Sequence, residues 1–186
     1  MDVFEAIHGR HMQTKVKQDA VPRAVIEKIL SAAVQAPNHY KIRPWRFVVM
    51  TGSGLDKLGD VFAASFAERQ PDAPAEALEK TRVLPRRAPL LIAVGVDKPS
   101  EPEVLAIENI VAVATACQNL LLAAQAEGLA VKWRTGEWAD DMKVKEFLGF
   151  SADQHVIAFL YIGYPESSPS EFPTRPSFED RTVWME

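Results

Sequence analysis

The segment 103–127 restricts the fold more than any other part of this sequence. Apolar residues surround it on nearly every side of a helical projection, and between residues 110 and 124 the only polar side chains are Thr115, Gln118 and Asn119. A helix on a protein surface normally has one apolar stripe and one polar face. We therefore expect one face of this helix to pack on a sheet and the other on a second subunit. The alternative is a helix that is wholly internal in a monomer.

The remaining elements are predicted from the spacing of apolar residues. Four short apolar runs have the length of strands, namely 45–51, 90–96, 130–133 and 156–162. Helical spacing predicts four further helices, at 3–9, 22–35, 55–66 and 140–148. The segment 68–87 is rich in charge, alanine and proline, and it favours a solvated helix or loop, with a mobile lid as the alternative. At 186 residues the chain has the size of one domain.

Charge and cysteine content exclude several classes of protein. The formal net charge is −4, and the lysines and arginines are scattered along the chain, so a nucleic-acid partner is not expected. Cys117 is the only cysteine, which rules out an intrachain disulfide and is compatible with a reducing compartment. The amino terminus lacks the basic and apolar regions of a leader, and no unbroken apolar run approaches the ~18 residues of a membrane span. We expect a cytoplasmic protein that does not bind membranes.

Three segments rich in arginine, tryptophan and histidine are the candidates for chemistry. They are residues 9–12, 36–46 and 132–136. The sequence has no dinucleotide-binding glycine motif, no phosphate-binding loop and no serine-hydrolase motif, and its four histidines lack the spacing of a metal site. A flavin mononucleotide needs cationic donors for its phosphate and flat or amide-bearing groups around its ring. The three segments supply both kinds of group.

These motifs, taken in order along the chain, resemble the nitroreductase superfamily. They are Arg10-His11-Met12, APNHYKIRPWRF at 36–47, RAPLLIAV at 87–94, AAQAEGLAVKWRTG at 123–136 and FLYIGYP at 159–165. The similarity covers residues 1–165 and is greatest to the small YdjA-type NAD(P)H nitroreductases.

The resemblance implies an α+β fold with a central, mostly antiparallel sheet wrapped by helices. It also implies an intertwined homodimer with one FMN per subunit at the subunit interface. Residues 1–165 would form one domain, and the proline-rich tail 166–186 would run extended over the surface or over the partner subunit. The implied reaction is a ping-pong transfer of hydride from NADH or NADPH, through FMN, to a nitroaromatic, quinone or similar small acceptor.

The resemblance also implies which residues bind the cofactors. The FMN residues are Arg10, His11, Met12, Gln35, His39, Lys41, Trp133, Arg134 and Thr135. The nicotinamide nucleotide is assigned to Ala123, Ala124, Gln125, Ala126, Glu127 and Gly128, although helix packing explains these small residues equally well. No side chain must act as an acid or nucleophile, since the flavin carries the hydride. His39 is either a donor to the ring or a structural histidine.

Two departures from the family pattern affect the site. The common Arg-Arg-Ser tripeptide is Arg10-His11-Met12 here, so the phosphate is expected to depend mainly on Arg10 and Arg134. Lys41 and Arg43 stand where many members have Asn and Gln. A cation near flavin N1 or O2 would stabilise the reduced anionic flavin, whereas an outward side chain would be an ordinary surface charge. Two further functions remain open, namely storage or sensing of FMN and a related dehydrogenation or dehalogenation.

Overall fold

The computed structural model describes residues 2–167 and 175–186. A four-stranded sheet forms its centre, with strand order β1-β2-β4-β3 and every neighbouring pair antiparallel. The strands are β1 (Trp45–Thr51), β2 (Leu90–Val96), β3 (Ala130–Arg134) and β4 (His155–Gly163). Every residue of β2 is buried, as its continuous apolar run predicted. The α+β fold with a mostly antiparallel sheet is confirmed.

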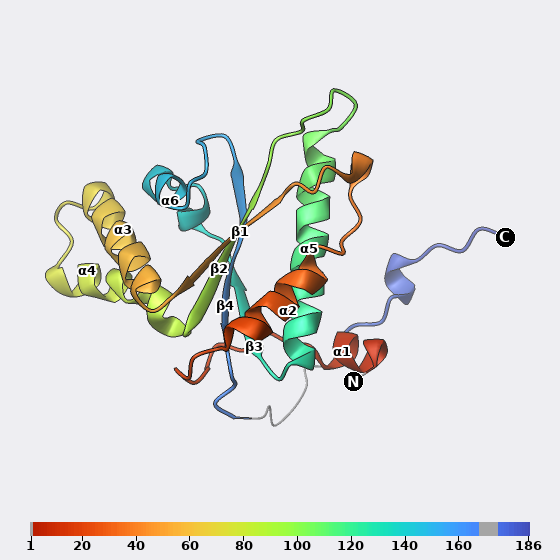
Figure 1. The fold of residues 1–186 in the computed structure, drawn as a ribbon, viewed down its shortest axis with the longest axis horizontal. Helices are drawn as coiled ribbons and strands as arrows, with labels where there is room; N and C mark the ends of the chain where they lie inside the picture. The colour runs from red at the N-terminus through yellow and green to blue at the C-terminus, as the bar shows by residue number, and fades with distance from the viewer. Residues whose placement is uncertain (1, 168–174) are drawn as a thin grey trace.

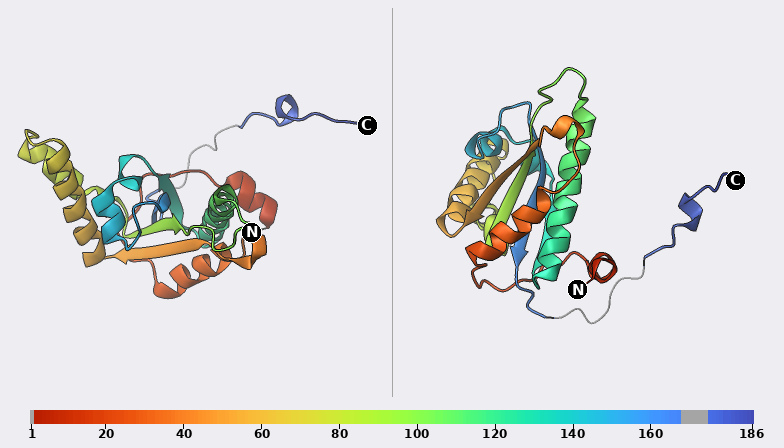
Figure 2. Two further views of the ribbon diagram at one scale, coloured as in Figure 1. Left: turned by 90° about the horizontal axis from the view of Figure 1, so that it is seen from above. Right: turned by 45° about the vertical axis from the view of Figure 1, so that its right-hand side comes forward.

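Helices cover both faces of the sheet, which therefore lies between two cores (Figure 1, Figure 2). On one face lie α2 (Arg23–Ala33) and α5 (Ala106–Ala126), and on the other lie α3 (Ser53–Arg69) and α6 (Met142–Phe147). The short helix α4 (Ala75–Arg82) packs along α3, and α1 (Val3–Gly9) lies near the carboxyl end of α5. This arrangement leaves β3 as an edge strand, against which the chain segment after α1 is laid.

The predicted segment 68–87 is helical over much of its length. Arg82 on α4 pairs with Asp60 on α3 at 3.1 Å, and Gly59 of α3 lies so close that an added Cβ would stand 2.1 Å from the carbonyl oxygen of Arg82. The charged helix α4, which packs on α3, agrees with the solvated helix that the composition of this segment favoured.

Helix α5 has the length and hydropathy of a membrane-crossing segment, but its buried side chains are part of the core. Val113, Cys117 and Leu120 pack against the sheet with no exposure. The opposite face is different, since Ile107 and Val111 are 58% and 56% exposed in the single chain. The sheet and α2 therefore cover one side of α5, and large apolar side chains stay exposed in its first turns.

The tail separates from the body of the fold after Pro165. Residues 168–174 lie outside the described residues, and residues 175–186 extend away from the sheet and helices (Figure 2). Within 175–186, Arg175 alone forms a hydrogen bond with the described body, donating to the carbonyl oxygen of Arg10 at 2.8 Å. Phe178 and Trp184 are 64% and 76% exposed. These described residues do not pack on the surface of their own chain.

Candidate functional site

Two of the predicted segments meet along the free side of β3. Met12 forms a parallel bridge with Val131, and the backbone N–H of Gln13 donates to the carbonyl oxygen of Val131 at 3.3 Å. The backbone N–H of Trp133 points at the sulfur of Met12, 3.5 Å away. Residues 12–13 thus lie beside residues 131–133 although some 120 positions separate them, and we call residues 10–12 and 133–136 together the β3 edge.

Arg10 carries the clearest sign of a missing ligand. It ends α1, and its Nη1 is buried without a hydrogen-bond partner in the described structure. Burial, and then the positive charge of Arg175, lower the pKa of the Arg10 guanidinium. Two cations side by side with an orphaned donor fit an anion such as a phosphate, because an unsatisfied buried N–H costs about 1–3 kcal/mol.

Arg175 was not among the predicted site residues, and it alters the expected phosphate contacts. Because residues 10–13 run parallel to β3 with Met12 opposite Val131, Arg10 and Arg134 stand about five strand residues apart, roughly 16 Å. The second cation beside Arg10 is Arg175. The only signal in the sequence was an arginine within a proline-rich tail.

His11 is held by local hydrogen bonds. Its Nδ1 lies 3.0 Å from the carbonyl oxygen of Gly9, and its Nε2 lies 2.6 Å from the amide nitrogen of Gln13. The carbonyl requires a proton on Nδ1, which leaves Nε2 as the acceptor of the Gln13 amide. His11 fixes the turn that follows α1.

The α2–β1 loop, residues 34–44, carries the other predicted FMN residues. Gln35 is exposed and donates to the carbonyl oxygen of Ser31 at 3.3 Å. His39 stacks on Tyr40, with ring centroids 4.5 Å apart, and its Nδ1 lies 3.1 Å from Glu108 at the start of α5. A shallow groove between this loop and α5 has a volume of about 390 Å³.

The same loop has an unusual backbone. Tyr40, Lys41 and Arg43 have φ values of 49°, 57° and 52°, in the left-handed region that costs non-glycine residues about 1–2 kcal/mol each. Asn38 holds the turn, since its Oδ1 accepts from the backbone N–H of Arg43 at 2.8 Å. Such conformations persist where the surroundings impose them, often at binding sites. The Lys41 side chain is exposed in the single chain.

One chain does not bring the two halves of the predicted FMN site together. His39 contacts Glu108 near the start of α5, whereas Gly9 lies beside Gln125 near its end. Seventeen helical residues separate these points, about 25 Å. His39 therefore lies about 25 Å along α5 from the end of α1 in the same subunit. Gln35 lies between these points, since the neighbouring Ala32 accepts a hydrogen bond from Asn119 of α5.

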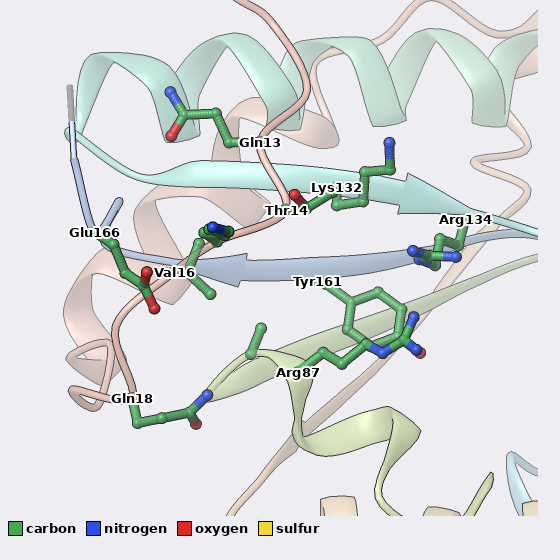
Figure 3. Close-up of a pocket in the computed structure, with 11 residues that line it drawn as sticks. Gln13, Thr14, Val16, Gln18, Arg87, Lys132, Arg134, Tyr161 and Glu166 are labelled. Atoms are coloured by element: carbon green, nitrogen blue, oxygen red, sulfur yellow. The ribbon is translucent and has the colours of Figure 1, made fainter. Parts of the chain in front are cut away.

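At the carboxyl end of β3 lie two neighbouring cavities of about 350 and 370 Å³, and Figure 3 shows the first of them. Arg87, Arg134 and Tyr161 line both of them, and Lys15 and Lys132 line the first. Burial raises the pKa of Tyr161, and the nearby charges of Arg134 and Arg87 oppose that rise. We call this cavity pair the basic pocket. Arg87 was not recognised from the sequence, where it reads as part of a strand-leading motif.

The loop after β3 is fastened to α3. Gly136 has a φ of 74°, and Trp138 stacks on Phe62 with ring centroids 4.1 Å apart. The Arg69 guanidinium lies 4.8 Å from the other face of Trp138 and pairs with Glu137. These contacts fix the position of Thr135 and Gly136 at the mouth of the basic pocket.

The residues predicted for the nicotinamide nucleotide form the last turn of α5. Ala124 has no exposure, Ala123 packs against the core and Glu127 pairs with Lys28. Gly128, with a φ of 73°, ends the helix. A helix carboxyl end carries partial negative charge and does not favour phosphates. These surroundings support the packing interpretation of the segment.

Comparison with known proteins identifies the relatives of this fold. The model of the family described as "Nitroreductase family" matches residues 7–164. This chain belongs to the nitroreductase family. Among its family relatives, YfhC of Bacillus subtilis, named as an NAD(P)H nitroreductase, is 32% identical over 97% of this chain and 93% of its own length. YdjA of Escherichia coli, with the same kind of name, is 28% identical over 91% and 92%.

Solved structures of the family share the fold. A nitroreductase-like protein from Bacillus cereus superposes with a TM-score of 0.86 at 24% identity, covering 100% of this chain and 97% of that one. A Desulfovibrio desulfuricans protein described as a nitroreductase in complex with FMN gives 0.76 at 23%, covering 100% and 98%. A more distant relative is iodotyrosine deiodinase 1 of Sus scrofa, 24% identical over 94% of this chain and 66% of its own length.

Proposed function

We propose that this nitroreductase-family chain is an FMN-dependent oxidoreductase that uses NADH or NADPH to reduce a small nitroaromatic or quinone. The observation that carries the proposal is the orphaned Nη1 of Arg10 beside Arg175, a ready site for a phosphate. FMN, when bound, supplies the redox chemistry by accepting a hydride from the donor and passing electrons to the acceptor. The names of YfhC and YdjA support NAD(P)H as the donor.

In this proposal each part of the β3 edge has its own task. Arg10 and Arg175 hold the phosphate of FMN. The backbone from Trp133 to Gly136 lies along the ring, at a distance from Arg10 that suits an extended flavin nucleotide. Thr135 is exposed at the strand end, where its hydroxyl is available to donate a proton.

The α2–β1 loop completes the site from a second copy of the chain. The exposed apolar face of α5, with Ile107 and Val111, supplies the contact. A two-fold pairing of α5 helices running in opposite directions would bring the loop of one copy to the β3 edge of the other. His39 and Lys41 then face the flavin in the homodimer, and the exposed tail residues have a partner surface to cover.

An absorbance spectrum of the purified protein, followed by anaerobic addition of NADPH and then NADH, tests the function. The expected result is a band near ~450 nm that bleaches with a nicotinamide nucleotide and recovers with a nitroaromatic or quinone. A band that persists with both donors would instead indicate storage or sensing of FMN, and no band after added FMN would overturn the proposal.

The phosphate assignment has its own test in Arg175→Gln. A charge-assisted hydrogen bond contributes about 1.5–3 kcal/mol, and because Arg175 is exposed we expect the lower end, a roughly 10-fold loss of FMN affinity. Riboflavin, which lacks the phosphate, should bind both proteins equally. Arg181→Gln is the control, since among the described residues Arg181 forms an ion pair only with neighbouring Asp180. Equal FMN affinity in Arg175→Gln and wild type would remove Arg175 from the site.

The similarity to iodotyrosine deiodinase 1 favours one second candidate, reductive dehalogenation of an aromatic substrate. Release of iodide from an iodinated phenol under anaerobic conditions, with NADPH as donor, would support it. Turnover of nitroaromatics without any halide release would exclude it.

A further inference from the structure

The basic pocket collects positive charge that the described structure does not neutralise. Lys15, Arg87, Lys132 and Arg134 line it, and none of them forms an ion pair with any residue in 2–167 or 175–186. Of the two carboxylates in the lining, Glu166 belongs to the first cavity, and Glu137 belongs to the second and pairs with Arg69. The protein as a whole carries a net charge of −4, so the positive charge of this pocket is opposite in sign to the net charge of the chain.

Arginines just outside the pocket behave differently. Arg86, adjacent to Arg87 in the chain, donates through Nε and Nη2 to both carboxylate oxygens of Asp56, at 2.7 and 2.6 Å. Arg82 pairs with Asp60 and Glu79. Arg82 and Arg86 therefore have carboxylate partners, whereas Arg87 and Arg134, which line the pocket, have none among the described residues. This difference indicates that the cations of the pocket are available to an anionic ligand.

The geometry of the pocket suits a phosphate group attached to a larger molecule. Figure 3 shows Arg87 and Arg134 approaching the ring of Tyr161, which is 8% exposed and forms part of the floor. The two cavities, of about 350 and 370 Å³, are within the range of small-ligand sites. The second cavity reaches Thr135 and Gly136, where the proposed flavin ring lies.

Neither the FMN phosphate nor the end of α5 accounts for this pocket. The proposed FMN phosphate site, Arg10 with Arg175, lies about 16 Å along β3 from Arg134. The last turn of α5 offers a helix carboxyl end and Glu127, with no free cation among residues 123–128. A nicotinamide donor that reaches the flavin ring must place its phosphates elsewhere.

We propose that the basic pocket binds the phosphate groups of the nicotinamide donor, with Arg87 as a specificity-determining residue that favours NADPH over NADH. The proposal rests on the proposed function, since it assumes that the donor reduces a flavin at the β3 edge. Four unpaired cations lie here against two carboxylates, and one of these, Glu137, is already paired with Arg69. This excess of positive charge suits a donor with an additional dianionic phosphate.

The test uses the FMN-loaded protein and two fragments of the donors. 2′,5′-ADP carries the phosphate that distinguishes NADPH, and 5′-AMP lacks it. By titration calorimetry we expect 2′,5′-ADP to bind more tightly than 5′-AMP. Arg87→Met should weaken 2′,5′-ADP binding roughly 10-fold, a modest figure because Arg87 is exposed. Arg86→Met is the matched control and should leave this binding unchanged.

Kinetics with the same variants separate this proposal from the proposed function. Arg87→Met should raise the KM for NADPH about 10-fold and leave the KM for NADH and the FMN content near those of wild type. Unchanged NADPH kinetics in Arg87→Met, with the flavin still bleached, would overturn the pocket assignment and leave the oxidoreductase intact. Loss of FMN in Arg87→Met alone would also overturn it, because the pocket would then belong to the flavin. A wild-type protein that no donor bleaches would overturn the proposed function itself.

Discussion

The β3 edge and the α2–β1 loop differ in how completely one chain builds them. At the β3 edge, residues from α1, β3 and the tail contact one another, and Trp138 is clamped between Phe62 and Arg69. In the loop, His39, Tyr40 and Lys41 are exposed, and three residues hold a left-handed backbone. The β3 edge is held in place by contacts within the subunit. The loop has a strained backbone, and few residues of the same subunit cover its side chains.

This difference supports our proposal that the flavin site is divided between two copies of the chain. A prepared anion site stands at one end of α5 and a strained, uncovered loop at the other, about 25 Å away. The exposed apolar residues of α5, Ile107 and Val111, lie at the end next to the loop. If one subunit formed the whole site, the anion site and the loop would lie next to each other and not at opposite ends of α5.

Breaking the contact between copies should have the largest effect. Val111→Glu places a carboxylate on the exposed face of α5, and burying it unpaired in a dimer would cost several kcal/mol. We expect a monomer at micromolar concentration in sedimentation and the loss of FMN from the purified protein. Val83→Glu, at an exposed position outside α5, is the control and should stay dimeric with its flavin. A dimeric Val111→Glu protein would place the interface elsewhere.

Two matched aromatic substitutions compare how much the contacts beside the β3 edge and those in the α2–β1 loop contribute to stability. Trp138→Leu removes the stack on Phe62 and the contact with Arg69, and we expect a loss of about 2 kcal/mol in the free energy of unfolding. Tyr40→Leu removes only an exposed stack on His39, so its cost should be below about 0.5 kcal/mol. Urea denaturation of both variants decides the matter. Similar losses would contradict the difference drawn between edge and loop.

The smallest effect concerns the anchoring of the loop to α5. The backbone N–H of Leu105 and then the ring of His39 lower the pKa of the Glu108 carboxyl below its ordinary value of 4.5. A lowered folded pKa means that the ionised carboxylate stabilises the fold above pH 4.5, and that this contribution disappears as pH falls through the folded pKa. Glu108→Gln should therefore melt below wild type at pH 7, and the two melting temperatures should converge below about pH 4. A constant difference across that range would exclude the charge as the cause.

The sequence predicted the framework better than the site. Strands 45–51 and 90–96 were located to the residue from their short apolar runs. β2 is buried along its whole length, as such a run predicts, whereas β1 exposes Arg46, Val49 and Thr51. The predicted helix at 103–127 was close to α5, and its all-round apolarity correctly indicated an uncovered face in the single chain.

The parts that sequence reasoning missed depend on contacts between distant residues. Arg175 contacts Arg10 although 165 positions separate them in the sequence, and no local sequence pattern predicts this contact. Arg86 and Arg87 look alike in the sequence, yet one pairs with Asp56 and the other lines the basic pocket. The left-handed backbone at Lys41 and Arg43 was equally hidden, because neither residue type prefers it.

Co-expression of two defective chains tests the divided site most directly. One chain carries Arg10→Met with Arg175→Gln, which removes the phosphate contacts of the β3 edge, and the other carries His39→Asp with Lys41→Glu, which places carboxylates in the loop. Each alone should form dimers without FMN. In random mixed dimers one site receives both intact halves, so FMN should return to about a quarter of all sites. An absence of flavin in the mixed dimers would show that one subunit builds the whole site.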